Sequence, residues 1–408
     1  MRIVQINGGA KGSTGKIMMG IAEVARQQGH EVMCASPITT TNRDAGKDCG
    51  YYRIGTFNSR RINVALARIT GFNGCFAWIE TYKLLKKINE FKPDIIHLHN
   101  LHDSYINLPM LFSYIKEHKV PVVWTLHDCW SFTGQCPHFT MVKCSKWKTG
   151  CNSCPQYKEY PSSLYDNTKK MWKLKKKWFT GIENMAIVTP SQWLANLVKE
   201  SYLKEYPVKV INNGIDLLVF KPTPYDGLNN ILNCTKTDNR YVILGVAFDW
   251  GRRKGLDVFI KLSQSLPTDL YRIVLIGTND YIDSQLPKDI VSIHRTQDQH
   301  QLAEIYTMSD VFVIPTREEN YPTVNLEALS CGTPVITFNT GGSSEMLDEE
   351  TGIIVDVDDV EAIKRAIEDV CEKKKCSNRD YIVKYSKKFD MRNKFTEYIK
   401  LYSDIIER

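Results

Sequence analysis

The chain has 408 residues, of which 43% are hydrophobic and 24% charged, a composition that is typical of globular domains and excludes a disordered or collagen-like protein. At about 150 residues per domain the length predicts two or three domains, and the net charge of +7 is compatible with phosphorylated ligands or anionic lipid without requiring nucleic acid. No apolar run is long enough to span a membrane, and the start MRIVQINGG favours a buried strand over a signal peptide, so we expect a cytoplasmic protein.

Short apolar runs alternate with longer amphipathic segments through the first half of the chain. Such runs predict buried parallel strands, because helices cover both faces of a parallel sheet. A helix is predicted over residues 17–28, after the first strand. The predicted strands cover residues 2–7, 29–36, 93–100, 121–128, 185–191 and 208–214.

The same alternation restarts in the second half. Helices are predicted around 256–266, 299–308 and 324–331. The predicted strands cover residues 241–248, 271–277, 291–295, 310–316, 333–339 and 351–357. A repeated strand–helix–strand order predicts a doubly wound α/β sheet, and two such series predict two Rossmann-like lobes.

The lobe boundary is predicted near 212–231, where the polar stretch KPTPYDGLNN suits a linker. We expect one domain over 1–211, with a Cys-rich insertion at 129–161, and a second over 212–385. The amphipathic end, 386–408, is expected to form a helix that packs back on the first domain. Ligands of doubly wound sheets bind beyond the carboxyl ends of the strands, so the cleft between the lobes is the expected active site.

The most informative stretch is REENYPTVNLEALSCGTPVITFNTGGSSE, residues 317–345. Glu319 and Glu327 are eight positions apart and straddle a predicted strand-to-helix turn. A carboxylate there can accept hydrogen bonds from sugar hydroxyls, and Glu327 can take a ribose in the same way. Backbone N–H groups at the helix start, near Thr323 and Val324, would hold a diphosphate. Taken alone, the two glutamates also fit a solvated helix surface.

The whole pattern, with Cys-Gly-Thr-Pro-Val-Ile and Gly-Gly-x-x-Glu following the glutamates, resembles the nucleotide-sugar site of family 4 glycosyltransferases. The segments VINNGID (210–216), VTPSQWLANLV (188–198) and RRKGLDVFI (252–260) resemble further parts of that family. The resemblance covers nearly the whole chain. It implies a GT-B fold, with two facing Rossmann-like doubly wound parallel-sheet domains. It also implies retaining transfer of a sugar from a UDP- or GDP-type nucleotide sugar, without a catalytic metal.

The resemblance assigns roles to individual residues of the second lobe. Lys254 would meet the diphosphate and stabilise the charge that the leaving group gathers as the glycosidic bond breaks. Glu319 would position the donor sugar and shield positive charge. Family members usually carry an Arg about six residues before the lysine; here that position is Phe248, so Arg252 or Arg253 is expected to substitute.

The first predicted strand is joined to its helix by GGAKGSTGKIM, residues 8–18. Gly12, Ser13, Thr14 and Gly15 are placed to present backbone amides to the donor phosphate or to the acceptor. The loop is neither a Walker A motif nor a clean G-x-G-x-x-G, so a simple tight turn is the alternative.

Histidines follow two predicted strands, in HLHNLHD (97–103) and TLHDCWSFTGQC (125–136). In the resembling family a histidine at the position of His127 meets the donor sugar near its C6 hydroxyl, where a neutral imidazole both donates and accepts. His99, Asn100 and Asp103 are candidates for contact with the acceptor. A satisfied structural histidine is the alternative in each case.

Residues 125–161 look like the subgroup of colanic acid and exopolysaccharide biosynthesis glycosyltransferases. Within them, C-x7-C-x6-C-x2-C is formed by Cys136, Cys144, Cys151 and Cys154. Four thiolates suit a structural zinc ion, with free thiols or disulfides as alternatives.

The segment TKKMWKLKKKWF, residues 168–179, joins six lysines to Trp172, Trp178 and Phe179. A basic amphipathic segment with Trp is typical of membrane-surface binding, and a polyprenyl-diphosphate-linked glycan at the inner leaflet would be a fitting acceptor. The alternative is a solvated lysine face whose tryptophans lie in the core.

Two other functions remain open from sequence. The first is a nucleotide-sugar epimerase or hydrolase on the same scaffold. The second is a zinc-knuckle nucleic-acid-binding protein, which would leave the 317–345 pattern unexplained. A glycosyltransferase accounts for both halves of the chain, and for it we expect no nucleic-acid partner.

Overall fold

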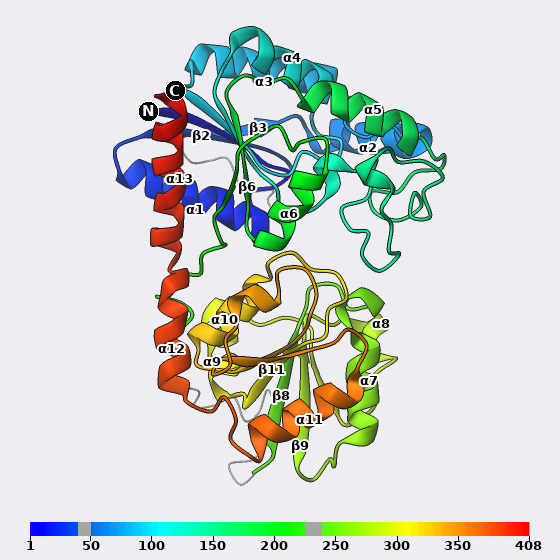
Figure 1. The fold of residues 1–408 in the computed structure, drawn as a ribbon, viewed down its shortest axis with the longest axis vertical. Coiled ribbons are helices and arrows are strands. Elements are labelled where there is room, and N and C mark those ends of the chain that lie inside the picture. Colours follow the sequence, from blue (N-terminus) through cyan, green and yellow to red (C-terminus); the bar gives the residue numbers. More distant parts are fainter. Residues whose placement is uncertain (40–49, 225–238, 408) are drawn as a thin grey trace. The chain divides into compact units, whose positions relative to one another are not determined.

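The computed structural model describes residues 1–39, 50–224 and 239–407, so most of the predicted linker KPTPYDGLNN lies outside the described residues. The chain forms two compact units, one of Met1–Asn212 with Lys394–Arg408 and one of Asn213–Asn393. The polypeptide leaves unit 1 after Asn212 and returns to it after Asn393, so the sequence of unit 2 is inserted within that of unit 1 (Figure 1).

Unit 1 is built on a seven-stranded parallel sheet with the order β3-β2-β1-β4-β5-β6-β7. The strands are β1 (Arg2–Ile6), β2 (Glu31–Pro37), β3 (Tyr51–Ile54), β4 (Ile95–Leu98), β5 (Val122–Thr125), β6 (Met185–Thr189) and β7 (Val208–Val210). Six correspond to predicted strands, and β3 was not predicted. The strand order reverses between β1 and β4, the position at which doubly wound sheets bind ligands.

Three helices of unit 1 begin at polar residues whose side chains satisfy a first-turn backbone N–H group. Thr56 and Ser59 form a reciprocal capping box at the start of α2, and Asn107 and Ser191 cap α4 and α6. The helices are α1 (Ser13–Gln27), α2 (Phe57–Thr70), α3 (Trp78–Phe91), α4 (Leu108–His118), α5 (Thr168–Phe179), α6 (Gln192–Glu200) and α13 (Met391–Ile406), with short 3₁₀ turns η1 (Trp130–Phe132) and η2 (Lys146–Lys148).

Helix α13 closes unit 1 from the far end of the chain and lies beside α1 (Figure 1). Alternate residues of a strand point to opposite faces, so Ile96 and Leu98 of β4 join the core under α3, α4 and α5. His97, between them, points to the other face and contacts Tyr402 of α13. A Cβ on Gly20 of α1 would lie 2.4 Å from the Phe395 ring, so glycine permits the close approach of α1 and α13.

Unit 2 contains a six-stranded parallel sheet with the order β10-β9-β8-β11-β12-β13, which reverses between β8 and β11. All six strands correspond to predicted ones. They are β8 (Tyr241–Val246), β9 (Tyr271–Ile276), β10 (Ile290–Ile293), β11 (Val311–Ile314), β12 (Val335–Phe338) and β13 (Gly352–Val355). The two parallel sheets confirm the predicted doubly wound α/β class.

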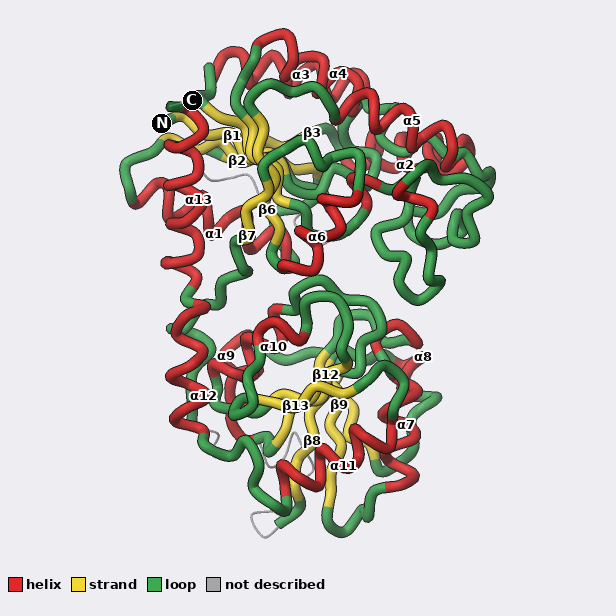
Figure 2. Tube along the Cα trace, viewed as in Figure 1, coloured by secondary structure: helices red, strands yellow, loops and turns green. Residues whose placement is uncertain are grey.

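Helices cover both faces of the sheet of unit 2 (Figure 2). Residues of α9, α10 and α12 pack on one face and those of α7 and α11 on the other. The elements are α7 (Leu256–Ser265), α8 (Asp280–Asp283), α9 (Gln299–Met308), α10 (Thr323–Ser330), α11 (Val360–Cys371) and α12 (Arg379–Ser386), with 3₁₀ turns η4 (Arg252–Lys254), η5 (Ser344–Met346) and η6 (Lys387–Phe389). Within the described ranges, no helix has the length and apolar character that crossing a bilayer requires.

Candidate functional site

In unit 2, the loops after β8 and β11 meet where the strand order reverses. Nζ of Lys254, in η4 after β8, lies 2.5 Å from Oε2 of Glu319, in the loop after β11. Oε1 of Glu319 accepts a hydrogen bond of 3.2 Å from the backbone N–H of Asn320. Both charged side chains are largely buried, which strengthens their attraction. The structure therefore brings together two residues that the sequence placed 65 positions apart.

Arg317 fixes the η4 turn against the loop after β11. Its guanidinium makes two hydrogen bonds of 2.8 Å to the Asp257 carboxylate and one of 2.6 Å to Asp358. It also donates to the backbone carbonyl of Arg252. Burial alone would raise the pKa of Asp257, but the hydrogen bond and charge of Arg317 outweigh it and lower that pKa. Sequence reasoning missed Arg317, whose only signal was its place beside the glutamate motif.

The arginine that accompanies Lys254 was left open between two residues. Arg252 is exposed, and Arg253 donates through Nη1 to the Glu318 carbonyl at 3.4 Å. Phe248, at the position where the resembling family carries Arg, follows β8 with 96% of its surface exposed. Arg253 is thus tied to the loop of Glu319, whereas Arg252 contributes its backbone carbonyl to Arg317.

Helix α10 begins directly after this loop, with Pro322 as its N-cap and no side chain capping it. The first-turn N–H groups, at Thr323 and Val324, therefore carry the partial positive charge that binds anions. One turn further, Glu327 accepts a hydrogen bond of 3.2 Å from the Tyr306 hydroxyl. Burial, followed by the Glu327 charge, raises the pKa of Tyr306, which keeps it a hydrogen-bond donor.

The Gly-Gly pair of the motif packs directly on the Glu319 loop. Gly341 has φ of 55°, and a Cβ at this position would lie 1.7 Å from the Glu319 carbonyl oxygen. The next residue, Gly342, donates its N–H to the Asn320 carbonyl at 2.7 Å. No other residue type fits at 341, because a side chain would overlap the backbone that carries Glu319.

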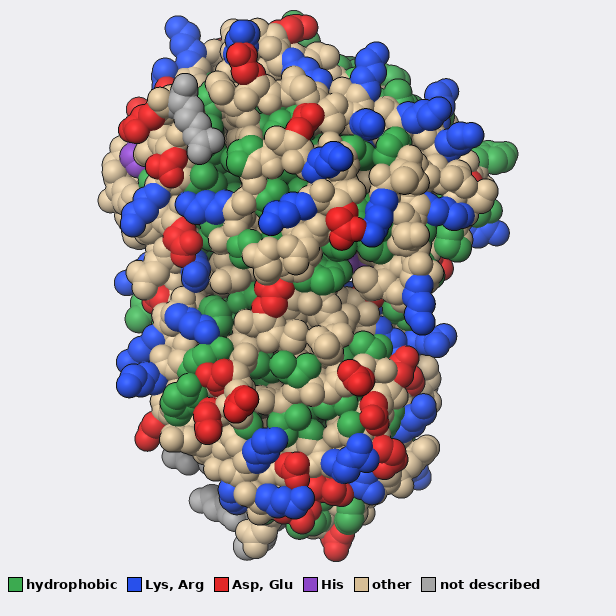
Figure 3. All heavy atoms as spheres, viewed as in Figure 1, with side chains coloured by type: hydrophobic (Ala, Val, Ile, Leu, Met, Phe, Trp, Pro, Cys, Tyr) green, Lys and Arg blue, Asp and Glu red, His purple; other side chains and the backbone are tan. Residues whose placement is uncertain are grey.

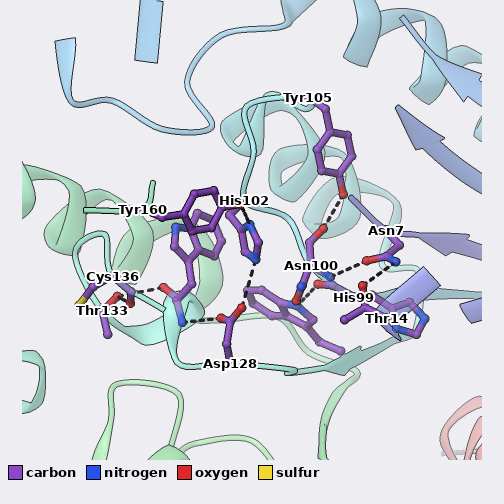
Figure 4. A network of polar contacts seen from close by, with 12 residues as sticks. Asn7, Thr14, His99, Asn100, His102, Tyr105, Asp128, Thr133, Cys136 and Tyr160 are labelled. Atoms are coloured by element: carbon purple, nitrogen blue, oxygen red, sulfur yellow. Dashed lines mark hydrogen bonds and ion pairs between the residues drawn. The ribbon is translucent and has the colours of Figure 1, made fainter. Parts of the chain in front are cut away.

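In unit 1, a buried asparagine after β1 ties the Gly-rich loop to the loop after β4 (Figure 4). Nδ2 of Asn7 donates to the Gly9 carbonyl at 2.8 Å and to the Thr14 hydroxyl at 3.2 Å. Oδ1 of Asn7 accepts from the backbone N–H of Asn100 at 3.2 Å. Asn7 was not predicted; its signal is a polar residue at the end of an apolar strand. The loop therefore also lies where a strand order reverses.

The four loop residues proposed to present amides differ in exposure. Gly12 has φ of 82° and is the N-cap of α1, and both it and Ser13 are exposed. Thr14 is partly buried, and Gly15 is buried against the backbone of Ala10. No side chain caps α1, so its first N–H groups resemble those of α10.

The two histidines after β4 and β5 contact each other. Nδ1 of His99 lies 3.1 Å from Nε2 of His127, and Nε2 of His99 lies 3.1 Å from Oε1 of Gln5. Burial lowers the pKa of His127 to about 4 and that of His99 well below its usual value, so both rings are neutral near pH 7. His99 is fully buried and His127 is partly exposed, so His99 orients the ring of His127.

A second histidine pair was missed from sequence (Figure 4). Nε2 of His102 lies 3.1 Å from Oδ2 of Asp128, and Nδ1 lies 2.9 Å from the Tyr160 hydroxyl. Burial would raise the pKa of Asp128, but the charge and hydrogen bond of His102 lower it. Both histidine pairs line one pocket of about 190 Å³ between the loops after β4 and β5.

Asp103, a candidate acceptor residue, forms an ion pair with Arg60 of α2. It also lines an open pocket of about 530 Å³ beside α2. The other polar residues of that pocket are Arg68, Asn73, Ser104, Gln135, Tyr160, Ser162 and Ser163. Asp103 therefore has a structural partner and also lines an open, polar pocket.

The four cysteines of the insertion, Cys136, Cys144, Cys151 and Cys154, line one small pocket and are free thiols. A hydrogen bond with Cys136 lowers the pKa of Cys154 to about 7 and raises that of Cys136. Among the described residues, however, the one group with three potential ligand atoms within 4.8 Å is Asp280, Asp283 and His294. The sulfur atoms therefore do not form a closed four-thiolate site, and the structural zinc finds no support here.

Helix α5 buries two of the three aromatic residues that were expected to face a membrane in 168–179. Trp172 and Phe179 are buried in the core of unit 1. Lys175 is also buried, and its Nζ donates to the carbonyls of Trp130 and Thr133. The remaining lysines of α5 are exposed, and Lys and Arg side chains gather over this part of the face in Figure 3. Trp178 is partly buried against the same core, so the aromatic side chains of this segment do not form an exposed face of their own.

Comparison with known proteins identifies both halves of the chain. Residues 15–218 match the family model described as Glycosyltransferase Family 4, and residues 234–389 match that of glycosyl transferases group 1. A putative colanic acid biosynthesis glycosyl transferase, WcaC of Escherichia coli K12, is 29% identical over 310 residues, 73% of this chain and 72% of that protein. The UDP-Gal:alpha-D-GlcNAc-diphosphoundecaprenol alpha-1,3-galactosyltransferase of Escherichia coli is 28% identical over 192 residues, 43% of this chain and 48% of that protein.

Solved structures of the same fold align over the full chain. Sucrose-phosphate synthase from Thermosynechococcus elongatus gives a TM-score of 0.71 at 18% identity and covers 100% of this chain and 99% of that one. Anabaena HepE in complex with UDP-glucose gives 0.66 at 14% identity and covers 99% of this chain and 100% of that one. These likenesses show a GT-B fold.

Proposed function

Because this chain belongs to Glycosyltransferase Family 4, we propose that it transfers a sugar from a nucleotide-diphosphate sugar to a hydroxyl group of a growing bacterial surface glycan or exopolysaccharide. The names of its relatives support this proposal: one is assigned to colanic acid biosynthesis and another uses a diphosphoundecaprenol-linked acceptor. HepE, of the same fold, binds UDP-glucose, which favours a uridine donor over a guanosine one. We further propose that the anomeric configuration is retained and that the acceptor is lipid-linked.

The Lys254–Glu319 pair beside the uncapped start of α10 carries the proposal. As the bond between the anomeric carbon and the diphosphate oxygen breaks, negative charge gathers on the diphosphate. The fixed ammonium and the N–H groups at Thr323 and Val324 therefore stabilise the transition state, in which the diphosphate is more negative, more strongly than they stabilise the bound donor. Their position is set before the donor arrives, by Arg317 and the Gly341 contact, so little reorganisation is needed.

The carboxylates have separate roles in this scheme. Glu319 holds Lys254 in place, accepts hydrogen bonds from sugar hydroxyls and shields the positive charge that develops on the sugar ring. Glu327 accepts from the ribose hydroxyls, with its carboxylate oriented by the Tyr306 hydroxyl. Arg253, tied to the Glu318 carbonyl, is the arginine we assign to the diphosphate beside Lys254.

We assign two roles to unit 1. Neutral His127, oriented by His99, donates to or accepts from a sugar hydroxyl, and its low pKa keeps this capacity constant near neutral pH. Asn100 and Asp103 are assigned to the acceptor, beside the loop of Gly12 and Ser13, which offers backbone amides to a phosphate.

Nucleotide binding measured by thermal shift tests the donor site, since a ligand that binds only the folded protein stabilises it by about 2.7 kcal/mol at a concentration of roughly 100 Kd. UDP and UDP-sugars should raise Tm of the parent, and Lys254→Ala and Glu327→Gln should lose the shift. Lys288→Ala, which removes an exposed lysine of unit 2 away from the pair, is the matched control.

Equal shifts for the parent and both site variants would show that the donor binds elsewhere. A parent that consumes the nucleotide sugar at the same rate with and without glycan acceptors would instead favour a hydrolase or an epimerase. Nuclear magnetic resonance of the product's anomeric proton distinguishes retention from inversion.

A further inference from the structure

Helix α2 of unit 1 exposes an apolar stripe instead of burying it. Only Asn63 and Ala67 of this helix are buried. Ile62, Leu66 and Ile69 recur at helical spacing, and all three are exposed. A surface helix normally turns such a stripe toward the core, and among the described residues no element covers this one.

The start of α3 continues the stripe. Trp78, Ile79 and Tyr82 are exposed, and the N-cap of α3, Ala77, donates its N–H to Oδ1 of Asn63 in α2 at 3.2 Å. The start of α3 therefore lies against α2, and we group the exposed apolar side chains of both helices as the α2–α3 surface: Ile62, Leu66, Ile69, Trp78, Ile79 and Tyr82. Their exposed fractions run from 36% to 68%.

A third segment extends this surface at the end of α2. The backbone N–H of Leu164 donates to the Arg68 carbonyl at 2.8 Å, which brings the exposed side chains of Leu164 and Tyr165 next to the helix. A monomeric soluble protein seldom leaves neighbouring large apolar side chains exposed unless they contact a partner or a membrane.

Basic residues border the α2–α3 surface. Helix α2 carries Arg60, Arg61 and Arg68 and no acidic residue, and Arg61 and Arg68 are exposed. From α5, Nζ of Lys170 lies 5.0 Å from the ring centroid of Phe72, just beyond the end of α2. Lys170 belongs to the exposed lysine face of α5, so that face adjoins the same region.

We propose that the α2–α3 surface docks unit 1 onto an anionic phospholipid bilayer. Apolar side chains including Trp and Tyr, flanked by Arg and Lys, are the composition by which interfacial helices insert among head groups and attract anionic lipid. A second copy of this chain is a poorer occupant, because both faces of an isologous contact would carry the same excess of positive charge.

This inference extends the proposed function, because a lipid-linked acceptor is presented at a bilayer, but its evidence lies in unit 1 alone. It also replaces the aromatic residues of 168–179 as the inserting group. The lysines of that segment keep an electrostatic role beside the α2–α3 surface.

Vesicle co-sedimentation without donor or acceptor tests the docking surface. We expect the parent to sediment with vesicles of phosphatidylglycerol and phosphatidylcholine, less with phosphatidylcholine alone, and less at high salt. The triple variant Ile62→Ser, Ile69→Ser, Ile79→Ser should lose most of this binding, and Arg61→Gln with Arg68→Gln should lose the preference for phosphatidylglycerol.

Matched controls come from exposed residues of unit 2. Leu218→Ser, Tyr281→Ser and Ile354→Ser remove as many exposed apolar side chains, and Arg295→Gln with Arg365→Gln removes as many exposed arginines; both sets should bind as the parent does. The nucleotide-induced thermal shift, measured on every variant, shows that each is folded and keeps donor chemistry separate from lipid binding.

Two results would overturn the proposal. The first is sedimentation of the triple variant equal to that of the parent. The second is a parent that does not bind vesicles but forms a dimer in light scattering that the triple variant abolishes, which would make a second copy the occupant. If nucleotides do not raise Tm of the parent, the proposed donor site is wrong, but the result on lipid binding is unaffected.

Discussion

Tyr402 and His97 are 305 positions apart, yet the tyrosine hydroxyl lies 2.6 Å from Nδ1 of the histidine, inside unit 1. The other ring nitrogen, Nε2, lies 2.8 Å from the Thr125 hydroxyl, so both polar edges of a fully buried imidazole are satisfied. Helix α13 thereby supplies a hydrogen-bond partner to a buried histidine of β4, the strand that is followed by His99.

Replacing Tyr402 by Phe leaves Nδ1 of His97 buried without its partner, while the ring that packs against it is kept. An unsatisfied buried polar group costs about 1–3 kcal/mol, so the free energy of unfolding in urea should fall by that amount. Tyr281→Phe removes a hydroxyl from an exposed tyrosine and should change stability little. Equal midpoints for the two variants would show that the contact contributes nothing.

Arg317→Lys keeps the positive charge but loses the planar fork that grips Asp257 through two nitrogens. The η4 turn should then hold Lys254 less firmly, and nucleotide affinity should fall roughly tenfold, which corresponds to one lost charge-assisted hydrogen bond. Titration calorimetry with UDP measures this, with Arg365→Lys on the exposed face of α11 as the control. Unchanged affinity would remove Arg317 from the donor site.

Gly341→Ala should disrupt the donor loop, because its Cβ would meet the Glu319 carbonyl oxygen and its φ is left-handed. We expect a loss of at least about 2 kcal/mol in unfolding free energy and a weakened UDP shift. Gly251→Ala is the matched substitution near the same site, since no atom lies within 4 Å of its Cβ and its φ of −173° is ordinary extended backbone. A tolerated Gly341→Ala would contradict the close packing of the two loops.

Unit 1 should lose stability as the pH falls through the range below 6.5. Burial lowers the pKa of His127 to about 4 from the ordinary 6.5, and those of His97 and His99 well below it. In this window the unfolded chain binds protons that the folded chain excludes, so the free energy of unfolding decreases as the pH decreases. For His127 alone the decrease is about 2 kcal/mol between roughly pH 7 and pH 5. Urea denaturation at the two values measures the slope.

The control for this slope is the exposed His300. His127→Asn should flatten the dependence of stability on pH, whereas His300→Asn should leave it as in the parent. If His127→Asn keeps the full slope, the pKa of His127 is not lowered in the folded protein.

Much of the fold followed from sequence because buried parallel strands are continuous apolar runs, and all six strands of unit 2 were found in this way. Strand β3 was missed because its four residues, YYRI, are largely unburied and pair with the sheet at one edge only. Helix α2 gave no clear core-facing pattern, since its apolar stripe does not face the core. Residues 168–179 were recognised as amphipathic and form α5, but amphipathicity does not tell which of two faces packs inward.

The motifs of the site were visible in the sequence, whereas the contacts between motifs were not. Asn7 reaches Asn100 across 93 positions, Asp128 reaches His102 across 26 and Arg317 reaches Asp257 across 60. Each contact joins segments that follow different strands, so predicting it requires the strand order. That order depends on how the sheets assemble, which the local pattern of residues does not encode.

Because the sequence of unit 2 is inserted within that of unit 1, the polypeptide can complete unit 2 first. A nascent chain that has reached Asn393 carries all of unit 2, while unit 1 still lacks the tyrosines that cover His97. A fragment ending at Asn212 would therefore lack α13, the helix that covers His97 on one face of the sheet. Completion of unit 1 therefore has to wait until Tyr398 and Tyr402 have been synthesised, because both rings pack against His97.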